Sequence, residues 1–84
     1  MREKTVFSDN YILFLRLLRA ARSKAGLTQE QLADRLGEKQ TFVSRCERGE
    51  RRLDIVEVRA FCVALEISFP AFVADFDRAV ARRR

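Results

Sequence analysis

Apolar residues recur along this chain at the three- and four-residue spacing of amphipathic helices, and polar stretches divide them into five segments. In the second segment, Leu32 and Leu36 share one face and are followed by Gly37, a residue that often ends a helix in a left-handed conformation. Thr28 and Gln31 have the spacing of a capping box, which marks the start of this helix. The pattern predicts helices over about residues 9–25, 29–36, 40–48, 55–65 and 69–82.

The other helix starts carry signals of the same kind. Ser8 and Ser68 are good N-cap residues, and Asp54 with Glu57 forms a second capping box. Pro70 is tolerated because it falls in the first turn of the last helix. The 84 residues are therefore expected to form one all-α domain over residues 1–84. The stripe expected to be buried on the fourth helix consists of Ile55, Val58, Phe61, Cys62 and Leu65.

The first and last helices have more apolar surface than one buried stripe needs. Residues 11–18 are apolar on more than one face, and residues 69–80 carry a wide apolar stripe. A second copy of the chain could cover this excess, which predicts a homodimer. Alternatively, the two stripes cover each other within one chain. The residues expected at the dimer interface are Tyr11, Phe14, Phe72, Phe76 and Val80.

The second and third predicted helices are short and are joined by a tight turn that contains Gly37. This arrangement is typical of a helix-turn-helix. The third helix would bury Val43 and Cys46 and leave polar side chains on its opposite side. These side chains can bond base edges and phosphates, so this is the candidate functional surface: Gln40, Thr41, Ser44, Arg45 and Arg48.

Composition narrows the classes of function. The net charge of +5 and the pI near 10 fit a polyanionic partner, although residues 28–52 hold six basic and five acidic side chains, so the excess is not concentrated there. The chain has no His and no cysteine cluster, so no metal site or cofactor is expected. Cys46 and Cys62 are interpreted as buried, reduced residues, with a disulfide or redox switch as the alternative. The longest apolar run is too short to span a membrane, which predicts a cytoplasmic protein.

Several segments together resemble the phage-repressor/Cro-type helix-turn-helix family, also called the XRE family. The resemblance implies a compact five-helix, lambda-repressor-like domain, usually dimeric, that binds an operator in double-stranded DNA and regulates transcription. It covers roughly residues 18–76 and rests on Arg22, Ala25–Ala33, Leu36-Gly37, Gln40, Val43-Ser44, Glu47–Gly49 and Ala64-Leu65.

Carried over by position, the resemblance agrees with the chemistry of the third helix. Gln40 can bond adenine through N6 and N7, Thr41 can reach a base or a thymine methyl, and Arg45 suits guanine O6 and N7. Ser44 also points into the groove. The expected phosphate contacts are Gln29, Lys39, Arg48, Arg51 and Arg52. The alternative for each arginine is an ordinary solvated surface charge.

The resemblance also implies a bridge between Arg22 and Glu47 that ties the first helix to the third. Both residues lie beside inward positions, and buried charges must be paired. The alternative is two solvated charges in loose contact. Two residues depart from the family pattern. Lys39 is a poor N-cap, and Glu66 stands where a Gly usually ends the fourth helix.

The leading hypothesis is a sequence-specific transcriptional regulator, a repressor or autoregulator that acts as a homodimer on DNA of the nucleoid. Small repressors, restriction–modification controllers and antitoxin-type autoregulators share this size. The alternative is a protein-interaction module, such as an antitoxin that neutralises a partner protein. An enzyme is not expected, because no nucleophile–base pair or Gly-rich phosphate loop is visible. RNA binding is disfavoured because the aromatic residues fall on inward stripes.

Overall fold

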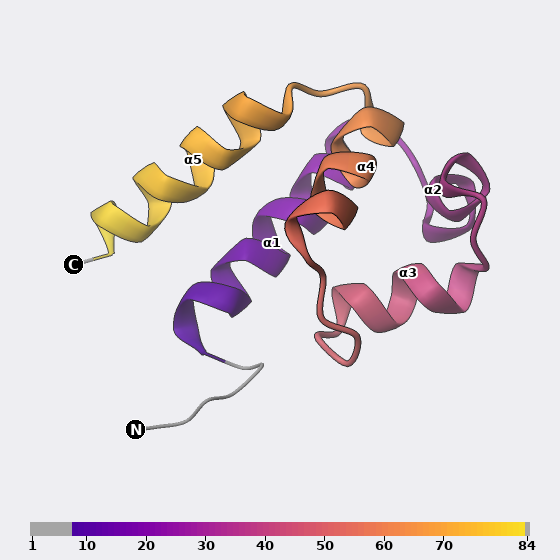
Figure 1. Ribbon diagram of the computed structural model, residues 1–84, viewed down its shortest axis with the longest axis horizontal. Coiled ribbons are helices and arrows are strands. Elements are labelled where there is room, and N and C mark those ends of the chain that lie inside the picture. The colour runs from indigo at the N-terminus through magenta and orange to yellow at the C-terminus, as the bar shows by residue number, and fades with distance from the viewer. Residues whose placement is uncertain (1–7, 84) are drawn as a thin grey trace.

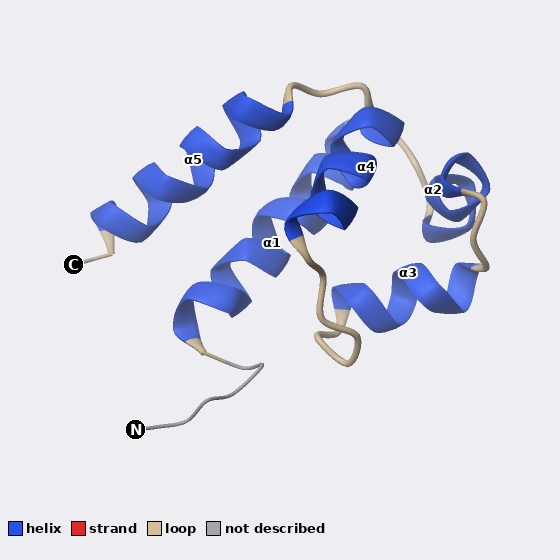
Figure 2. Cartoon of the chain, viewed as in Figure 1, coloured by secondary structure: helices blue, strands red, loops and turns tan. Residues whose placement is uncertain are grey.

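The structure, a computed structural model, describes residues 8–83 and contains five α-helices and no strand within that range (Figures 1 and 2). The predicted all-α, five-helix fold is confirmed. The first and third helices each end one residue earlier than expected, and the expected 1–84 extent includes ends outside the described residues. The helices are α1 (Asp9–Lys24), α2 (Gln29–Leu36), α3 (Gln40–Glu47), α4 (Ile55–Leu65) and α5 (Phe69–Arg82).

Side-chain caps fix the start of four of these helices. The Ser8 hydroxyl accepts a hydrogen bond from the Tyr11 amide, and the Ser68 hydroxyl caps α5 in the same way. Capping boxes start α2 and α4, as their sequences predict. Helix α3 is the exception, because its N-cap residue, Lys39, makes no side-chain hydrogen bond to the first turn. The start of α3 therefore keeps amide groups that a phosphate could satisfy.

The core lies where α1, α2, α3 and α4 meet. In Figure 1, α5 lies along one side of α1, while α2 and α3 form a unit at the other end of the molecule. Each large apolar side chain buried here stabilises the fold by roughly 1.5–3 kcal/mol. The inner side of α3 is thereby fixed, and its outer side remains exposed. The largest side chains with almost no exposed surface are Leu18, Leu32, Val43, Cys46, Phe61 and Cys62.

Glu66, the residue in place of the usual glycine, ends α4 in the left-handed conformation with φ 60°. This conformation costs a residue with a side chain about 1 kcal/mol relative to Gly. The helix end is nevertheless well bonded. Arg35 Nη1 donates to the carbonyl of Ala64 at 2.9 Å and lies 3.4 Å from a carboxylate oxygen of Glu66. The fold tolerates the strain, and α4 ends at Glu66 in the left-handed conformation that a glycine would adopt.

The structure revises two expectations about apolar residues. Tyr11, Phe14 and Phe72 were expected between copies, but they are at most 9% exposed within one chain, where the Phe14 ring packs edge-on against Phe72 and Phe76. For these residues, the stripes of α1 and α5 cover each other. Ile55 was expected in the buried stripe of α4, but it is 68% exposed at the first position of that helix.

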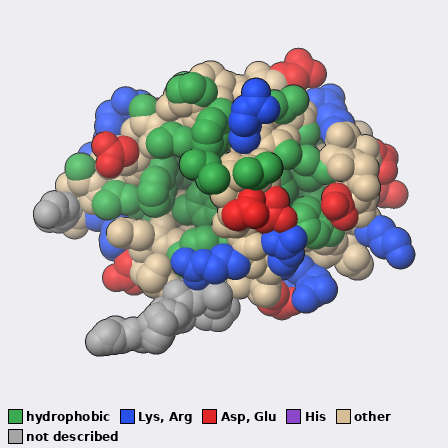
Figure 3. Space-filling model, viewed as in Figure 1, with side chains coloured by type: hydrophobic (Ala, Val, Ile, Leu, Met, Phe, Trp, Pro, Cys, Tyr) green, Lys and Arg blue, Asp and Glu red, His purple; other side chains and the backbone are tan. Residues whose placement is uncertain are grey.

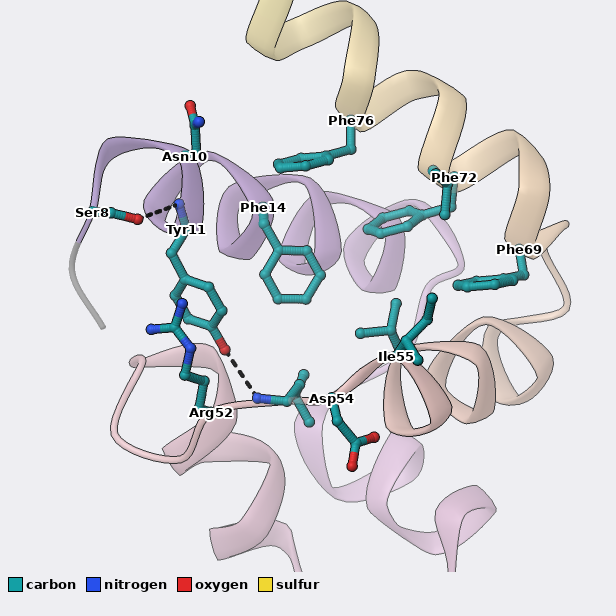
Figure 4. Close-up of a pocket in the computed structure, with 13 residues that line it drawn as sticks. Ser8, Asn10, Tyr11, Phe14, Arg52, Asp54, Ile55, Phe69, Phe72 and Phe76 are labelled. Atoms are coloured by element: carbon teal, nitrogen blue, oxygen red, sulfur yellow. Dashed lines mark hydrogen bonds between the residues drawn. The ribbon is translucent and has the colours of Figure 1, made fainter. Parts of the chain in front are cut away.

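Between α1, α4 and α5 the surface is hollowed into an open groove of about 360 Å³, here called the apolar groove. Figure 3 shows hydrophobic side chains gathered over this part of the molecule, and Figure 4 shows Phe69, Phe72 and Phe76 of α5 along one side of the groove. Its lining consists of Ser8, Asn10, Tyr11, Phe14, Arg52, Leu53, Asp54, Ile55, Val58, Phe69, Phe72, Val73 and Phe76.

Candidate nucleic-acid interface

The third helix has one buried side and one exposed polar side. Val43 and Cys46 are fully buried, whereas Gln40, Thr41 and Arg45 are exposed. Ser44 is half-buried beside them. The helix is eight residues long, so the polar side chains cover about two turns. This is the length that a recognition helix presents to the bases of a major groove.

The exposed side is connected to α2 by a hydrogen bond between two glutamines. Gln40 Nε2 donates to Gln29 Oε1 at 2.7 Å, although eleven positions separate the two residues. Gln29 Nε2 in turn donates to Glu47 Oε1 at 2.9 Å. Two residues predicted to contact DNA separately are therefore in direct contact in the free protein.

Glu47 is a buried carboxylate surrounded by donors. Arg22 donates to both of its oxygens, at 2.7 Å through Nε and 3.1 Å through Nη2, and Arg19 Nε lies 3.4 Å away. Its side chain is 0% exposed and that of Arg22 is 13% exposed. Arg22 also donates to the carbonyl of Leu27 at 2.9 Å. Burial alone would raise the pKa of the Glu47 carboxyl, but the hydrogen bonds from Arg22 and Gln29 and the charge of Arg22 hold it below its usual value.

A second acidic residue, Glu50, pairs with arginines at the exposed end of α3. Arg48 donates to its two oxygens at 2.9 and 3.1 Å, and Arg45 Nε lies 4.0 Å from one of them. Arg48 also donates to the Ser44 hydroxyl. The hydrogen bond from Arg48 lowers the pKa of the Glu50 carboxyl. The side chains of this cluster are half exposed, in contrast to those around Glu47.

A hollow of about 560 Å³, here called the concave surface, is lined by residues from the turn between α2 and α3, from α3 and from the loop after α3. Lys39, Thr41, Arg45 and Arg51 all contribute to it, so the structure brings these predicted DNA contacts together. Arg51 is held in place by Glu57, with hydrogen bonds of 3.0 and 2.6 Å, and its guanidinium lies 5.3 Å from the centre of the Phe42 ring. Three cations at a concave surface suit a phosphate backbone.

Arg52 lies elsewhere. Its guanidinium stacks 4.2 Å above the Tyr11 ring and lines the apolar groove rather than the concave surface (Figure 4). The backbone amide of the next residue, Leu53, donates to the Tyr11 hydroxyl at 3.1 Å. Of the predicted phosphate contacts, Lys39 and Arg51 line the concave surface, whereas Arg52, Gln29 and Arg48 do not. The loop turns the Arg52 side chain back toward α1.

Comparison with known proteins agrees with this geometry. A family model described as a helix-turn-helix domain matches residues 13–76. An XRE-family like protein from Pseudomonas syringae pv. tomato str. DC3000 is 43% identical, with a TM-score of 0.80 over 83% of this chain and 85% of that one. The protein belongs to the XRE-type helix-turn-helix family. No relative was found among curated protein sequences.

Two restriction–modification controller proteins are also similar in structure. C.AhdI from Aeromonas hydrophila is 33% identical, with a TM-score of 0.65 over 73% of this chain and 92% of that one. The C.Esp1396I tetramer in complex with its natural 35 base-pair operator is 27% identical, with a TM-score of 0.76 over 84% of this chain and 93% of that one. As a member of the XRE family, this chain is a DNA-binding protein of the transcription-regulator type.

For this XRE-family domain, sequence analysis missed two residues near the interface, Arg19 and Glu50, and the hydrogen bond that Gln29 makes with Glu47. The partners of Glu47 were expected to include Arg22 alone, but Arg19 and Gln29 also bond it. Arg19 lies three residues before Arg22, so helical spacing could have identified it. Glu50 was not singled out, although an acidic residue amid three arginines is an obvious partner for them.

Proposed function

We propose that this protein is a sequence-specific regulator of transcription that acts as a homodimer on double-stranded operator DNA, as a repressor or autoregulator, in the cytoplasm. The single observation that carries the proposal is the exposed side of α3, where Gln40, Thr41 and Arg45 stand above a fully buried inner side. Such a helix can enter a major groove without disturbing the core. Operator binding by a similar controller protein supports the same reading.

Each polar side chain on the outer side of α3 has a proposed role that follows from its hydrogen-bond donors and acceptors. Gln40 bonds adenine, Arg45 bonds guanine, and Thr41 and Ser44 contact neighbouring base edges. Phosphates are held by Gln29, Lys39, Arg48 and Arg51, which surround this side of the helix. Arg48 must release Glu50 to do so. Arg52 is not included among the proposed phosphate contacts, because its guanidinium is stacked on the Tyr11 ring.

The homodimer is proposed to form over the apolar groove. Ile55 and Val73 both line it and are 68% and 43% exposed, so the groove carries large apolar side chains that remain open to solvent. Phe76 and Val80 of α5 are partly exposed and extend this surface. The lining includes no residue of α3, so contact between copies and contact with DNA use separate surfaces. A two-fold dimer would read half-sites about 34–36 Å apart, one helical turn of DNA.

The first experiment selects bound sites from random double-stranded DNA at two salt concentrations. We expect an inverted repeat whose half-sites are one helical turn apart, and an affinity that falls steeply as salt rises. Selection of a single non-repeated site would contradict the dimer. Absence of any sequence preference would contradict the proposed function itself.

The second experiment tests the groove with Ile55→Glu. Ile55 opens α4, where an acidic side chain suits the helix dipole, so the fold should persist while the groove gains a charge. We expect sedimentation to show monomers and operator affinity to fall. The matched control is Val63→Glu, because Val63 is 59% exposed on the same helix but does not line the groove. Equal effects of the two changes would contradict this interface.

The groove also supports the alternative function, a module that captures another protein. A partner protein would need to cover the same residues as a second copy does. Homodimers that bind DNA with Ile55 buried would exclude this alternative. A monomer that binds no duplex DNA and forms a stable one-to-one complex with a partner protein would favour it.

A further inference from the structure

A continuous line of hydrogen bonds runs from the core to the exposed side of α3. It begins at the buried carboxylate of Glu47, passes through the amide of Gln29 and ends at the amide of Gln40. The two links measure 2.9 and 2.7 Å. Glu47 and Gln40 are the last and first residues of α3, so α2 supplies the bridge between the two ends of the recognition helix.

The donors and acceptors along this line of hydrogen bonds can be arranged in only one way. An ionised carboxylate accepts hydrogen bonds and donates none, and the double hydrogen bond from Arg22 keeps Glu47 in that form. Gln29 must therefore turn its NH₂ group toward Glu47. Its carbonyl oxygen then points to the other end of the amide and can only accept a hydrogen bond. Gln40 must present its own NH₂ group to that oxygen.

The orientation of Gln40 decides which base it can bond. With one Nε2 hydrogen held by Gln29, Gln40 has its Oε1 and its second Nε2 hydrogen left for DNA. Adenine offers a matching pair, the N6 donor and the N7 acceptor, whereas guanine offers two acceptors, O6 and N7. An untethered amide can turn both Nε2 hydrogens toward guanine. The tethered amide cannot, because its oxygen would face guanine O6.

We propose that Glu47, acting through Gln29, is a specificity-determining residue that restricts Gln40 to adenine and rejects guanine. This inference rests on the proposed function, since it concerns the base that Gln40 meets. Glu47 is a positioning residue, because its side chain is 0% exposed and touches no DNA. The second Nε2 hydrogen of Gln29 remains available to a phosphate, so the relay and the expected phosphate contact of Gln29 are compatible.

The test variant is Gln29→Lys. A lysine donates to Glu47 and attracts phosphate, but it has no acceptor for Gln40, so only the second link is lost. Gln29 is half-buried at the start of α2, and the change leaves the bonds between Arg22 and Glu47 in place. The control is Gln31→Lys, which adds the same charge to an exposed position of the same helix that bonds neither Glu47 nor Gln40. It removes the capping-box bond from the Thr28 amide, so any effect of a weakened α2 start appears in this variant at every base position.

The experiment measures operator affinity for wild type, both lysine variants, Glu47→Leu and Gln40→Ala on duplexes with each base at every position. Gln40→Ala identifies the base pair that Gln40 reads. We expect wild type to prefer adenine there by about tenfold or more over guanine, consistent with the value of one bidentate contact. Gln29→Lys should reduce this ratio to about twofold while the ratios at other positions stay unchanged. Glu47→Leu, which has no acceptor for Gln29 and is assayed well below its melting temperature, should show the same positional loss, and Gln31→Lys should show none at that single position.

The outcomes separate this inference from the proposed function. If wild type distinguishes no sequences, both are overturned. If wild type is specific but Gln29→Lys keeps its full preference for adenine, or if the base read by Gln40 is guanine, the relay is overturned while DNA binding stands. A loss spread evenly over all positions would also overturn it, since that result indicates a phosphate contact or a shifted helix.

Discussion

Two carboxylates three residues apart, Glu47 and Glu50, both pair with arginines near the end of α3, but in opposite surroundings. Glu47 has no exposed side-chain surface, and its arginine partner Arg22 has very little. Glu50 and its partner Arg48 are half exposed. Burial makes the first pair a fixed part of the fold, because separating buried charges leaves each without water. The second pair is screened by solvent and can be exchanged for another anion, such as a phosphate.

The largest expected effect comes from breaking the buried pair. Arg22→Met or Glu47→Gln alone should lower the free energy of unfolding by about 3–5 kcal/mol, because the remaining group loses its buried partner. The double variant should cost less than the sum of the two changes. Denaturation of the four proteins measures this directly. Small and additive effects would mean that burial does not distinguish Glu47 from Glu50.

Acid provides a second way to test the comparison. The pKa of the Glu47 carboxyl is lowered from its usual value of 4.5, so the unfolded chain takes up protons before the folded chain does. The contribution of Glu47 to the free energy of unfolding should therefore be fully present above about pH 5. It should be lost as the pH falls through the pKa of Glu47 in the folded protein. Urea titrations from pH 6 to pH 3 should show a shallower fall in Glu47→Gln than in wild type. Glu50→Gln should resemble wild type, because solvent screens that pair.

At the exposed end, Arg45→Ala should change which sequences are bound. Arg45 points out of α3 and is loosely paired with Glu50 at 4.0 Å, so it is available to a base. Losing a bidentate contact with guanine should cost about 1–3 kcal/mol of discrimination at one base pair. Arg51→Ala is the comparison, since Arg51 follows the helix and should affect all sequences equally, with a salt slope smaller by about one unit. Identical specificity profiles would remove the distinction between base and phosphate contacts.

The smallest effect is expected from Glu50→Gln. This change frees Arg48 and Arg45 from a competing carboxylate and removes a negative charge beside the phosphate backbone, so DNA affinity should rise. Thermal stability should change little, because the pair is exposed. Affinity measured at several salt concentrations tests both statements. Weaker binding would show that Glu50 orients Arg48 toward DNA rather than competing for it.

Local signals in the sequence were sufficient for most of the fold. Ser8, Thr28, Asp54 and Ser68 begin helices as predicted, since capping depends on neighbours within one turn. The prediction that Ile55 is buried was wrong. Ile55 lies on the predicted face of α4, but whether that face is covered depends on where α5 lies. Helical periodicity gives the direction of a side chain and not the presence of a neighbour.

The candidate site was harder to predict than the fold because it depends on angles between helices. The sequence indicated that Gln29 and Gln40 both belong to the interface, but only the packing of α2 on α3 brings their amides to 2.7 Å. Arg52 follows Arg51 directly in the sequence, yet the loop turns it toward Tyr11. A single peptide step separates a side chain at the concave surface from one at the apolar groove.

The burial of Cys46 on the inner side of α3 makes its thiol a built-in reporter of local opening. The side chain is 0% exposed, and burial raises the pKa of the thiol to about 11, so an alkylating reagent reacts only after the helix leaves the core. Cys62 gives the same report for α4. Equal labelling rates would mean that the domain opens as one cooperative unit. Faster labelling of Cys46 would give the free energy with which the recognition helix detaches by itself.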